Sequence, residues 1–505
     1  MLALVACSPP DDASRHSYGP DHQGGTTAVY LNRDPGGFDA LKIGSANKAT
    51  LQTQAAVYDM LFDLDPKTGD LQPRLGLSAT PLEGGTIWRV ALRPGVFFSN
   101  GEHFTSQAYV IHFGRLLASA TAGAMTQSLG ARLVSVHAVD DLTVDFVLAQ
   151  PSPNFKVALA TPGLAWFGLN APGYTLQHQS DPDFAYRPVG NGPYMVKSIT
   201  TGEGLTLVRN PRYWNPTTQH LDRIEYRVLG EGIAPFIALK AGDIDMMYAS
   251  DDLTLARAKR DPAVLTYVGP PFFSGYRINL GAGRGPLADP RVREALVYSL
   301  NREAANKAWS QGLAEIASDA YGKGSPWYCP DLRYPGYRPE LARRLIAAYG
   351  KPLHLTLGVE PFSARAAEIF QAMWKDVGID VTVVTGSRGP GFYKQIREHA
   401  FDMWYAPGPG NNNPLMVDMD LGSWERNSPI GIRSKAIDES IGQVSSAKSR
   451  AALYTASCRY QQVLANELPF IRFTFAPNGL ITRKYIGGVT PLTSADAQYY
   501  KVWLR

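Results

Sequence analysis

The chain has 505 residues, which is too long for one ordinary hydrophobic core, so its length predicts more than one domain. Hydrophobic residues make up 45% of the chain and charged residues 19%, a composition typical of a folded protein rather than a disordered one. The formal net charge of +4 is slight for this length and gives no sign of nucleic-acid binding, which would need a clustered basic surface.

The N-terminus carries a short apolar run that ends in a cysteine. Leu4, Val5 and Ala6 precede Cys7, a pattern that resembles the lipobox of bacterial lipoproteins, whose cysteine is acylated and becomes the mature N-terminus. The alternative is an ordinary apolar start, because a basic segment before the run is missing and the run is short. A start codon assigned too late would explain both features. Residues 8–25 are rich in proline, glycine and aspartate without apolar periodicity, which predicts a flexible tether after a signal-peptide remnant.

Further along, strand-like and helix-like patterns alternate, which predicts mixed α/β domains. Three short segments have the apolar pattern of strands: residues 28–31, 86–92 and 143–148. Asp289 is suited to cap a helix that begins with Pro290, because proline lacks an N–H that this position does not need. Ser363 opens a second helix, Gly378 suits the left-handed position after its end, and residues 379–384 follow as a strand. This succession predicts a sheet with crossover helices in the C-terminal half.

Proline and glycine interrupt these patterns most densely in residues 188–193, 281–286 and 407–414. The last segment reads Pro-Gly-Pro-Gly-Asn-Asn-Asn-Pro, which neither a helix nor a central strand tolerates. It is either a loop that contacts a ligand or a plain surface turn.

Catalytic motifs are missing from the sequence. It contains no phosphate-binding G-x-x-x-x-G-K-[ST] loop, no H-E-x-x-H pair and no G-x-S-x-G nucleophile elbow. No stretch has eighteen uninterrupted apolar residues that would span a membrane. We therefore expect no catalytic residue, no metal site and no cofactor, although a glycosidase would need only two acids positioned by the fold.

The three cysteines show no metal-binding spacing. If Cys7 is acylated, Cys329 and Cys458 remain. In an oxidising compartment they form a disulfide, or they are two unrelated buried thiols; the sequence leaves both open.

Six segments, in order, resemble the dipeptide/oligopeptide/nickel family of ABC-transporter solute-binding proteins, extracellular solute-binding protein family 5. The segment from Leu92 to Gly101 is similar to the family's "LR-x-G-V-x-F-x-x-G" signature. Residues 188–194 resemble its "P-x-G-T-G-P-Y" turn, and residues 209–214 resemble its "R-N-P-x-Y-W". The remaining matches are residues 242–245, residues 289–301, and Arg450, Leu453, Tyr454, Leu468 and Pro469 near the end.

The resemblance covers residues 26–505 and implies a periplasmic-binding-protein-like α/β fold. It consists of two main lobes around a hinge of two chain crossings, near Phe273 and Phe475, with an additional inserted lobe. The expected lobes are I (residues 26–50, 184–273 and 477–505), II (residues 51–183, the insertion) and III (residues 274–476), after residues 1–25 as signal remnant and tether. A ligand would lie between lobes I and III, and the lobes would close around it.

The resemblance also implies where a ligand would be held. In dipeptide-binding relatives, an acid in a "G-W-x-x-D-x-x-D-P" loop holds the peptide's amino terminus, and the arginine of an "R-P-Y" segment holds its carboxylate. Here Gly410 falls at the acid's position, Asn413 at the second acid, and Glu360 at the arginine. A free dipeptide is therefore not the expected ligand, and a neutral or cationic one is favoured, because Glu360 would repel a carboxylate. The alternative for Glu360 is a surface acid in a turn.

The expected ligand-binding residues come from these two segments and two nearby tryptophans: Glu360, Trp404, Gly410, Asn411, Asn412, Asn413 and Trp424. The asparagines supply donors and acceptors, and the indole rings supply an aromatic face.

The expected function is that of the extracytoplasmic binding component of an ABC importer. It would be a monomer, anchored by lipid to the periplasmic or extracellular face of the cell membrane, that delivers a peptide-like or other small polar organic ligand to a membrane permease. The alternatives are a non-transport envelope protein with the same fold and a hydrolase.

Overall fold

The computed structural model describes residues 23–42, 48–64, 71–119, 133–149, 151–152, 155–160, 168–249, 251–268, 276–323, 325–360, 363–386, 390–407, 428–475, 479–489 and 501–505. Cys7, Gly410, Asn411, Asn412, Asn413 and Trp424 lie outside these residues. Helices and sheets alternate along the chain, so the predicted α/β class is confirmed. In the described part of the chain, no helix is both long enough and apolar enough to cross a membrane.

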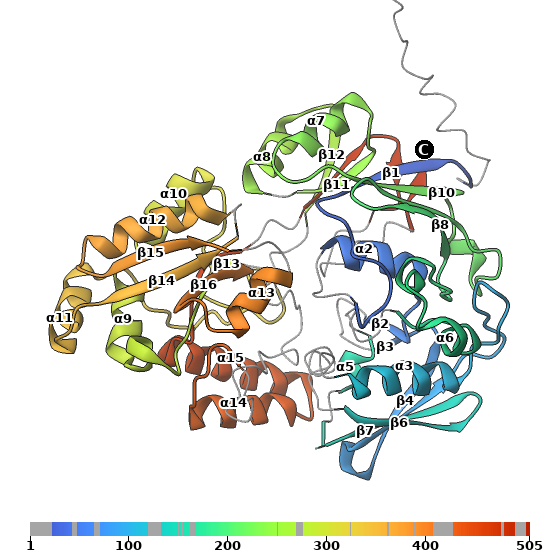
Figure 1. The fold of residues 1–505 in the computed structure, drawn as a ribbon, viewed down its shortest axis with the longest axis horizontal. Coiled ribbons are helices and arrows are strands. Elements are labelled where there is room, and N and C mark those ends of the chain that lie inside the picture. Colours follow the sequence, from blue (N-terminus) through green and yellow to red (C-terminus); the bar gives the residue numbers. More distant parts are fainter. Residues whose placement is uncertain are drawn as a thin grey trace, which may run out of the picture.

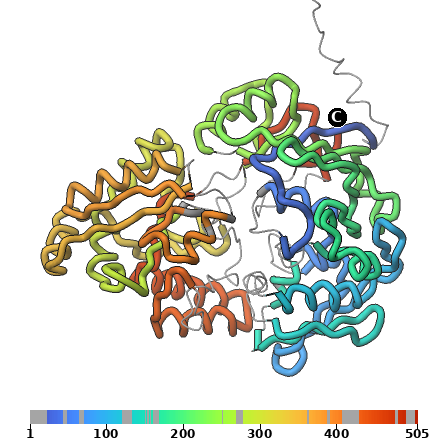
Figure 2. Tube along the Cα trace, viewed as in Figure 1, coloured from blue at the N-terminus to red at the C-terminus, as the bar shows by residue number. Residues whose placement is uncertain are grey.

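The fold has two bodies, which lie side by side in Figure 1. The first body, blue to green, contains a seven-stranded sheet in the order β12-β18-β11-β1-β10-β9-β8. Its strands are β1 (Thr26–Leu31), β8 (Tyr194–Thr200), β9 (Gly204–Arg209), β10 (Arg223–Val228), β11 (Met246–Tyr248), β12 (Val264–Val268) and β18 (Gly479–Arg483). β18 comes from the C-terminal end of the chain, which returns to this body in Figure 2.

A four-stranded antiparallel sheet belongs to the same body, in the order β4-β5-β7-β6. Its strands are β4 (Gly76–Leu82), β5 (Ile87–Leu92), β6 (Leu133–Asp140) and β7 (Thr143–Leu148). The strand predicted at residues 86–92 is confirmed as β5, in which Trp88, Val90 and Leu92 are buried and the residues between them are not. Two short ladders complete the strands: β2 (Phe62–Leu64) with β3 (Leu71–Pro73), and β19 (Ile486–Gly487) with β20 (Trp503–Leu504).

Helices of the first body are α2 (Lys48–Val57), α3 (Ser106–Ala118), α5 (Phe155–Ala158), α6 (Pro172–His178), α7 (Ala234–Ala241) and α8 (Asp252–Arg260). Short 3-10 turns are η1 (Glu83–Gly85), η2 (Phe184–Tyr186) and η3 (Pro216–Thr218) in this body and η4 (Gly285–Ala288) in the second.

The second body, yellow to orange-red in Figure 1, contains a five-stranded sheet in the order β15-β14-β16-β13-β17. Its strands are β13 (Tyr276–Leu280), β14 (His354–Val359), β15 (Asp380–Thr385), β16 (Met403–Pro407) and β17 (Phe470–Thr474). Its helices are α9 (Pro290–Tyr298), α10 (Arg302–Ser310), α11 (Pro339–Tyr349), α12 (Ala364–Lys375), α13 (Pro390–Arg397), α14 (Lys435–Ser445) and α15 (Arg450–Glu467).

Local signals place two helices of the second body, α9 and α12, as predicted. α9 begins with Pro290, and the Asp289 carboxylate accepts a hydrogen bond from the Arg291 backbone N–H at 2.9 Å. α12 begins directly after Ser363, and Gly378 has a φ of 89° after its end.

Each body has its own hydrophobic cluster. One cluster of buried side chains draws on residues 28–264 and 480–504, and it is continuous through both sheets of the first body. A separate cluster draws on residues 278–473. The chain therefore passes between the two clusters twice, between Val268 and Tyr276 and between Thr474 and Gly479.

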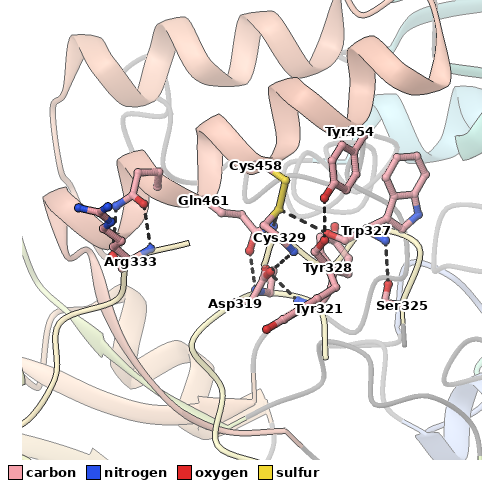
Figure 3. The surroundings of a disulfide bond; sticks show 12 residues. Asp319, Tyr321, Ser325, Trp327, Tyr328, Cys329, Arg333, Tyr454, Cys458 and Gln461 are labelled. Carbon is pink, nitrogen blue, oxygen red and sulfur yellow. Dashed lines mark hydrogen bonds between the residues drawn. A yellow bond between two sulfur atoms is a disulfide. The ribbon is translucent and has the colours of Figure 1, made fainter. Parts of the chain in front are cut away.

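The strands fall within the pieces of the three expected lobes, and the boundaries of those lobes remain a prediction. Cys329 and Cys458, which the sequence left open, are joined by a disulfide between the segment before α11 and helix α15 (Figure 3).

Candidate functional site

The candidate site lies at one edge of the five-stranded sheet. β14, β15 and β16 are parallel, so their carboxyl ends, after Val359, Thr385 and Pro407, reach the same edge. β13 begins and β17 ends at this edge as well, because Tyr276 is opposite Pro407 and Thr474. Ligands of open α/β sheets bind outside the carboxyl ends of the strands. Both predicted ligand-binding segments therefore start from this edge, the first chain crossing ends at it, and the second leaves from it.

The seven-stranded sheet presents its own carboxyl edge to the crossings. β1, β10 and β11 are parallel, and β12 runs in the same direction, because β11 and β12 both pair antiparallel with β18. Val268, the end of β12, pairs with Gly479, the start of β18. The stretch from Thr474 to Gly479 can span at most about 17 Å when fully extended. The two carboxyl edges are therefore held close together where the chain crosses.

Glu360 follows β14 directly at this edge and is 6% exposed. Its backbone carbonyl accepts a hydrogen bond from the Ser363 N–H at 2.9 Å, at the start of α12. An enclosed carboxylate interacts more strongly with an opposite charge than one in water does. The surface-turn alternative for Glu360 therefore does not describe this structure, whereas its contact with a ligand remains a prediction.

Trp404 lies in β16, opposite Gly358 of β14, and is 5% exposed. Its side chain belongs to the hydrophobic cluster of the second body, so in this structure it is a core residue. A role as an open aromatic face for a ligand remains a prediction, as do the roles of Gly410, Asn411, Asn412, Asn413 and Trp424.

The structure adds residues that sequence reasoning missed. Arg277 and Asn279 in β13 and Arg472 in β17 are 5%, 3% and 3% exposed. Arg277 is directly opposite Arg472, and Asn279 is directly opposite Trp404, so these side chains share one face of the sheet. The alternation of side chains extends this face to Glu360, two residues beyond Gly358.

We name this surface the polar face: Arg277, Asn279, Glu360, Trp404 and Arg472. Both arginine guanidinium carbons lie over the ring of Phe470, at 4.3 Å and 4.9 Å from its centroid. Strands covered on both faces usually read as continuous apolar runs, so polar side chains at alternate positions mark a face with another task. The alternation of Arg277 and Asn279 with Ile278 and Leu280 was the available sequence signal.

At the carboxyl edge of the seven-stranded sheet, acidic and aromatic side chains gather. The rings of Tyr30 and Tyr248 have centroids 5.0 Å apart. The Asp251 carboxylate caps α8 by accepting from the Thr254 N–H at 2.7 Å. Burial, assisted by the Asp251 charge, raises the pKa of Asp252 to about 6. This edge thus carries titratable groups that the sequence analysis did not select.

The family-like signature segments meet elsewhere, inside the first body. The Asp59 carboxylate forms an ion pair with Arg74 and accepts hydrogen bonds from the Tyr213 hydroxyl at 3.1 Å and the Trp214 indole N–H at 2.8 Å. Arg93 lies over the Trp214 ring, 4.1 Å from its centroid, and donates to the Arg74 carbonyl at 2.7 Å. These residues connect the part that carries the four-stranded sheet to the part that carries the seven-stranded sheet. They are structural and do not lie at the edge with the polar face.

The glycine-rich turn of residues 188–194 joins the same contact. A Cβ on Gly190 would lie 2.1 Å from the Val57 carbonyl oxygen, and one on Gly192 would lie 2.5 Å from the Val57 carbonyl carbon. The Asn191 side-chain oxygen accepts a hydrogen bond from the Asp59 N–H at 3.0 Å. Both glycines are required because backbone packs directly on backbone.

Among the described residues, no group of three or more histidine, cysteine, aspartate or glutamate side chains could hold a metal ion. Two α/β bodies joined by two crossings, with polar side chains at the joined edges, define the class of ligand-binding proteins that hold a solute between two lobes. The model of "Bacterial extracellular solute-binding proteins, family 5 Middle" matches residues 70–424, and the chain belongs to this family.

Two characterised relatives illustrate how far the sequence similarity extends. The chain is 27% identical over 433 residues to the nickel-binding periplasmic protein of Escherichia coli K12, covering 81% of this chain and 79% of that protein. It is 23% identical over 509 residues to heme-binding protein A of Haemophilus influenzae, covering 93% and 91%. The predicted family is therefore confirmed.

A solved structure shows the same fold at low sequence identity. The periplasmic binding protein DppA of Helicobacter pylori, in complex with the peptide STSA, superposes with a TM-score of 0.84 at 18% identity, covering 96% of this chain and 99% of that one.

Proposed function

We propose that this protein is the extracytoplasmic solute-binding component of an ABC importer. It captures a peptide-like or other small polar organic ligand between its two bodies and delivers it to a membrane permease. One observation carries the proposal: in a member of a solute-binding family, two separate hydrophobic clusters are connected by two crossings at the carboxyl edges of their sheets.

The physical mechanism is closure of the two bodies. A ligand that contacts both bodies binds the closed state more tightly than the open one, and this difference in affinity shifts the population toward closure. Closure removes the ligand's polar groups from water, so protein groups must replace the lost hydrogen bonds. The polar face supplies carboxylate and guanidinium groups near the edge beside both crossings, and the Asn279 amide three residues farther into the sheet.

We propose a neutral or cationic ligand in preference to a free zwitterionic dipeptide. By the resemblance described above, Glu360 falls at the position of the arginine of dipeptide-binding relatives. Its side chain is buried, and we propose that its carboxylate pairs with an ammonium group or accepts hydrogen bonds from hydroxyls. Arg277 and Arg472 lie farther along the same face, where both are stacked on Phe470. The asparagines of residues 411–413 supply further polar contacts, and Trp404 and Trp424 supply aromatic ones.

Calorimetry tests this preference with defined probes: the dipeptide Met-Leu, the peptide Ser-Thr-Ser-Ala, glutathione, nickel(II) and the diamine putrescine. The first four are taken from what relatives bind. For a cationic ligand, Glu360→Gln should lower the affinity more than tenfold, because removing one partner of a buried charge pair costs about 2–5 kcal/mol. Glu340→Gln, at an exposed position of α11, is the matched control and should leave the affinity unchanged. Sub-micromolar binding of Met-Leu would contradict the proposed preference.

We further propose that the protein binds its ligand without chemical turnover. Mass spectrometry of the ligand before and after incubation should show the same molecule, and small-angle scattering should show a smaller radius of gyration in the complex. A converted ligand would favour the hydrolase alternative. An unchanged scattering profile at saturation would contradict closure.

We propose a monomer anchored to the membrane by lipid at Cys7, exposed on the periplasmic or extracellular side. The sequence Leu4-Val5-Ala6-Cys7 supports the anchor. In detergent partitioning, the wild type should enter the detergent phase and Cys7→Ala should enter the aqueous phase. A wild-type protein from its native host that already enters the aqueous phase would refute the anchor. If no membrane permease needs this protein for uptake, the alternative of a non-transport envelope protein would be favoured.

A further inference from the structure

A long connection in the second body is held in place by several specific contacts. Residues 311–338 join α10, which ends at Ser310, to α11, which begins at Pro339, and their described part contains no helix and no strand of the main sheets. Connections of this length without secondary structure of their own are uncommon in compact domains and usually have a function. We call residues 311–338 the brace segment.

Helix α15 anchors the brace segment along one helical face. Cys329 is joined to Cys458 by the disulfide, 129 residues apart in the sequence. One turn to either side, the Tyr454 hydroxyl donates to the Tyr328 carbonyl at 3.0 Å, and the Gln461 side-chain oxygen accepts from the Ala320 N–H at 2.5 Å. Figure 3 shows these three side chains of α15 directed toward the brace segment. The disulfide is therefore the covalent member of a row of contacts at helical spacing.

A buried aspartate organises the turn around Cys329. The Asp319 carboxylate accepts hydrogen bonds from the Cys329 N–H at 2.7 Å and the Tyr321 N–H at 3.2 Å, and the side chain is 3% exposed. Its backbone carbonyl accepts a hydrogen bond from the Arg472 guanidinium of β17 at 3.4 Å. Asp319 thus connects the disulfide to the last strand before the second crossing.

The brace segment also pairs with the chain directly before that crossing. The Ala317 N–H donates to the Phe473 carbonyl at 3.0 Å, and the Phe475 N–H donates to the Glu315 carbonyl at 2.9 Å. Ile316 and Thr474 form an antiparallel bridge between these two hydrogen bonds. Ala317 and Phe475 are buried together, at 1% and 3% exposure. The brace segment therefore extends the sheet at β17 and holds the residue from which the chain departs for the first body.

We propose that the Cys329–Cys458 disulfide controls the order of residues 473–475, where the second crossing begins, so that its redox state sets the affinity for ligand. In the oxidised protein, the row of contacts on α15 keeps the brace segment against Phe473 and Phe475. A dithiol reductant transfers two electrons and two protons to the disulfide, which becomes two thiols, while the reductant itself becomes a disulfide. The brace segment then keeps only non-covalent contacts with α15, and closure must first order residues 473–475, which weakens binding.

The consequence for affinity rests on the proposed function, whereas the order of the crossing does not. The first measurement therefore uses the full-length protein without ligand. Hydrogen exchange with mass spectrometry compares the oxidised protein, the dithiol-reduced and alkylated protein, and the double variant Cys329→Ser, Cys458→Ser. Amides of Ala317 and Phe475 should exchange at least tenfold faster when the disulfide is absent, while amides of β14 change less than twofold.

Tyr454→Phe is the matched control, because it removes one hydrogen bond of the row on α15 and keeps the disulfide. It should leave the exchange of Phe475 within twofold of the wild type. Equal acceleration throughout the second body would overturn the proposal in favour of a purely stabilising disulfide, and so would an unchanged rate at Phe475. If the double variant does not fold, the reduced wild-type protein decides the question.

The second measurement is calorimetric titration of both redox states with the probes named above. Any probe that binds the oxidised protein should bind the reduced protein at least fivefold more weakly, and equal affinity would overturn the link to ligand binding. If no probe and no co-purified solute binds the oxidised protein, the proposed function fails, and the exchange result still decides whether the disulfide orders the crossing.

Discussion

The buried ion pair of Asp59 offers a sharp test of how the first body is held together. Its side chain has no exposed surface and that of Arg74 is 9% exposed. The same carboxylate accepts hydrogen bonds from Tyr213 and Trp214, which belong to another part of the chain. Asp59→Asn keeps the size of the side chain and one acceptor oxygen but removes the charge. Arg74 is then left as a buried cation that has lost the Asp59 charge, while its contact with the Asp63 carboxylate, 3.0 Å away, is kept.

The expected loss follows from the burial of the pair. Removing one partner of a buried ion pair costs about 3–5 kcal/mol, because the other charge stays out of water. Asparagine still accepts one hydrogen bond, and Asp63 still offsets part of the charge, so we expect a loss near the lower figure, about 3 kcal/mol. For a body of this size, that loss lowers the melting temperature by about 5–10 °C.

Scanning calorimetry is the assay, because two bodies with separate hydrophobic clusters should unfold in two transitions. Asp59→Asn should lower the transition of the first body and leave that of the second body in place. Asp145→Asn is the matched control: Asp145 pairs with the exposed Arg89 through two hydrogen bonds of 2.8 Å on the four-stranded sheet. Exposed pairs contribute little, so this variant should hardly shift either transition. Equal small shifts in both variants, or a shift of the second body's transition, would refute the reasoning.

Three further changes test local features. Burial raises the pKa of Asp252 to about 6, so ionising this carboxyl group in the folded protein lowers the free energy of unfolding. This loss is absent below about pH 4, grows between about pH 4 and 6, and stays constant at higher pH. Asp252→Asn should therefore raise the free energy of unfolding at pH 7 by at most about 3 kcal/mol, and it should flatten the decrease in stability between pH 4 and 6. Unfolding curves of the wild type and the variant at pH 4, 6 and 7 decide this. Gly190→Ala should prevent soluble expression or lower the melting temperature strongly, because its Cβ would collide with the Val57 carbonyl. Gly114→Ala, exposed in α3 with open space around its Cβ, should raise stability by about 1 kcal/mol in the same assay.

Local signals in the sequence were sufficient to predict many of the elements. Asp289 and Pro290 determine where α9 begins, and Gly378 follows α12 in the left-handed conformation, because capping and φ preference depend on adjacent residues alone. The alternation in β5 likewise reports which face is buried. The ordered signature segments identified the family, since each one is a short local pattern.

Contacts between distant parts of the chain were decided only by the tertiary structure. The sequence does not show that Asp59 meets Trp214, that Arg277 lies opposite Arg472, or that Cys329 pairs with Cys458. β18 enters the first sheet between β11 and β12 after the chain has built the whole second body. Such pairing depends on the packing of complete surfaces rather than on neighbouring residues, so a candidate site at the joined edges becomes visible only when both sheets are in place.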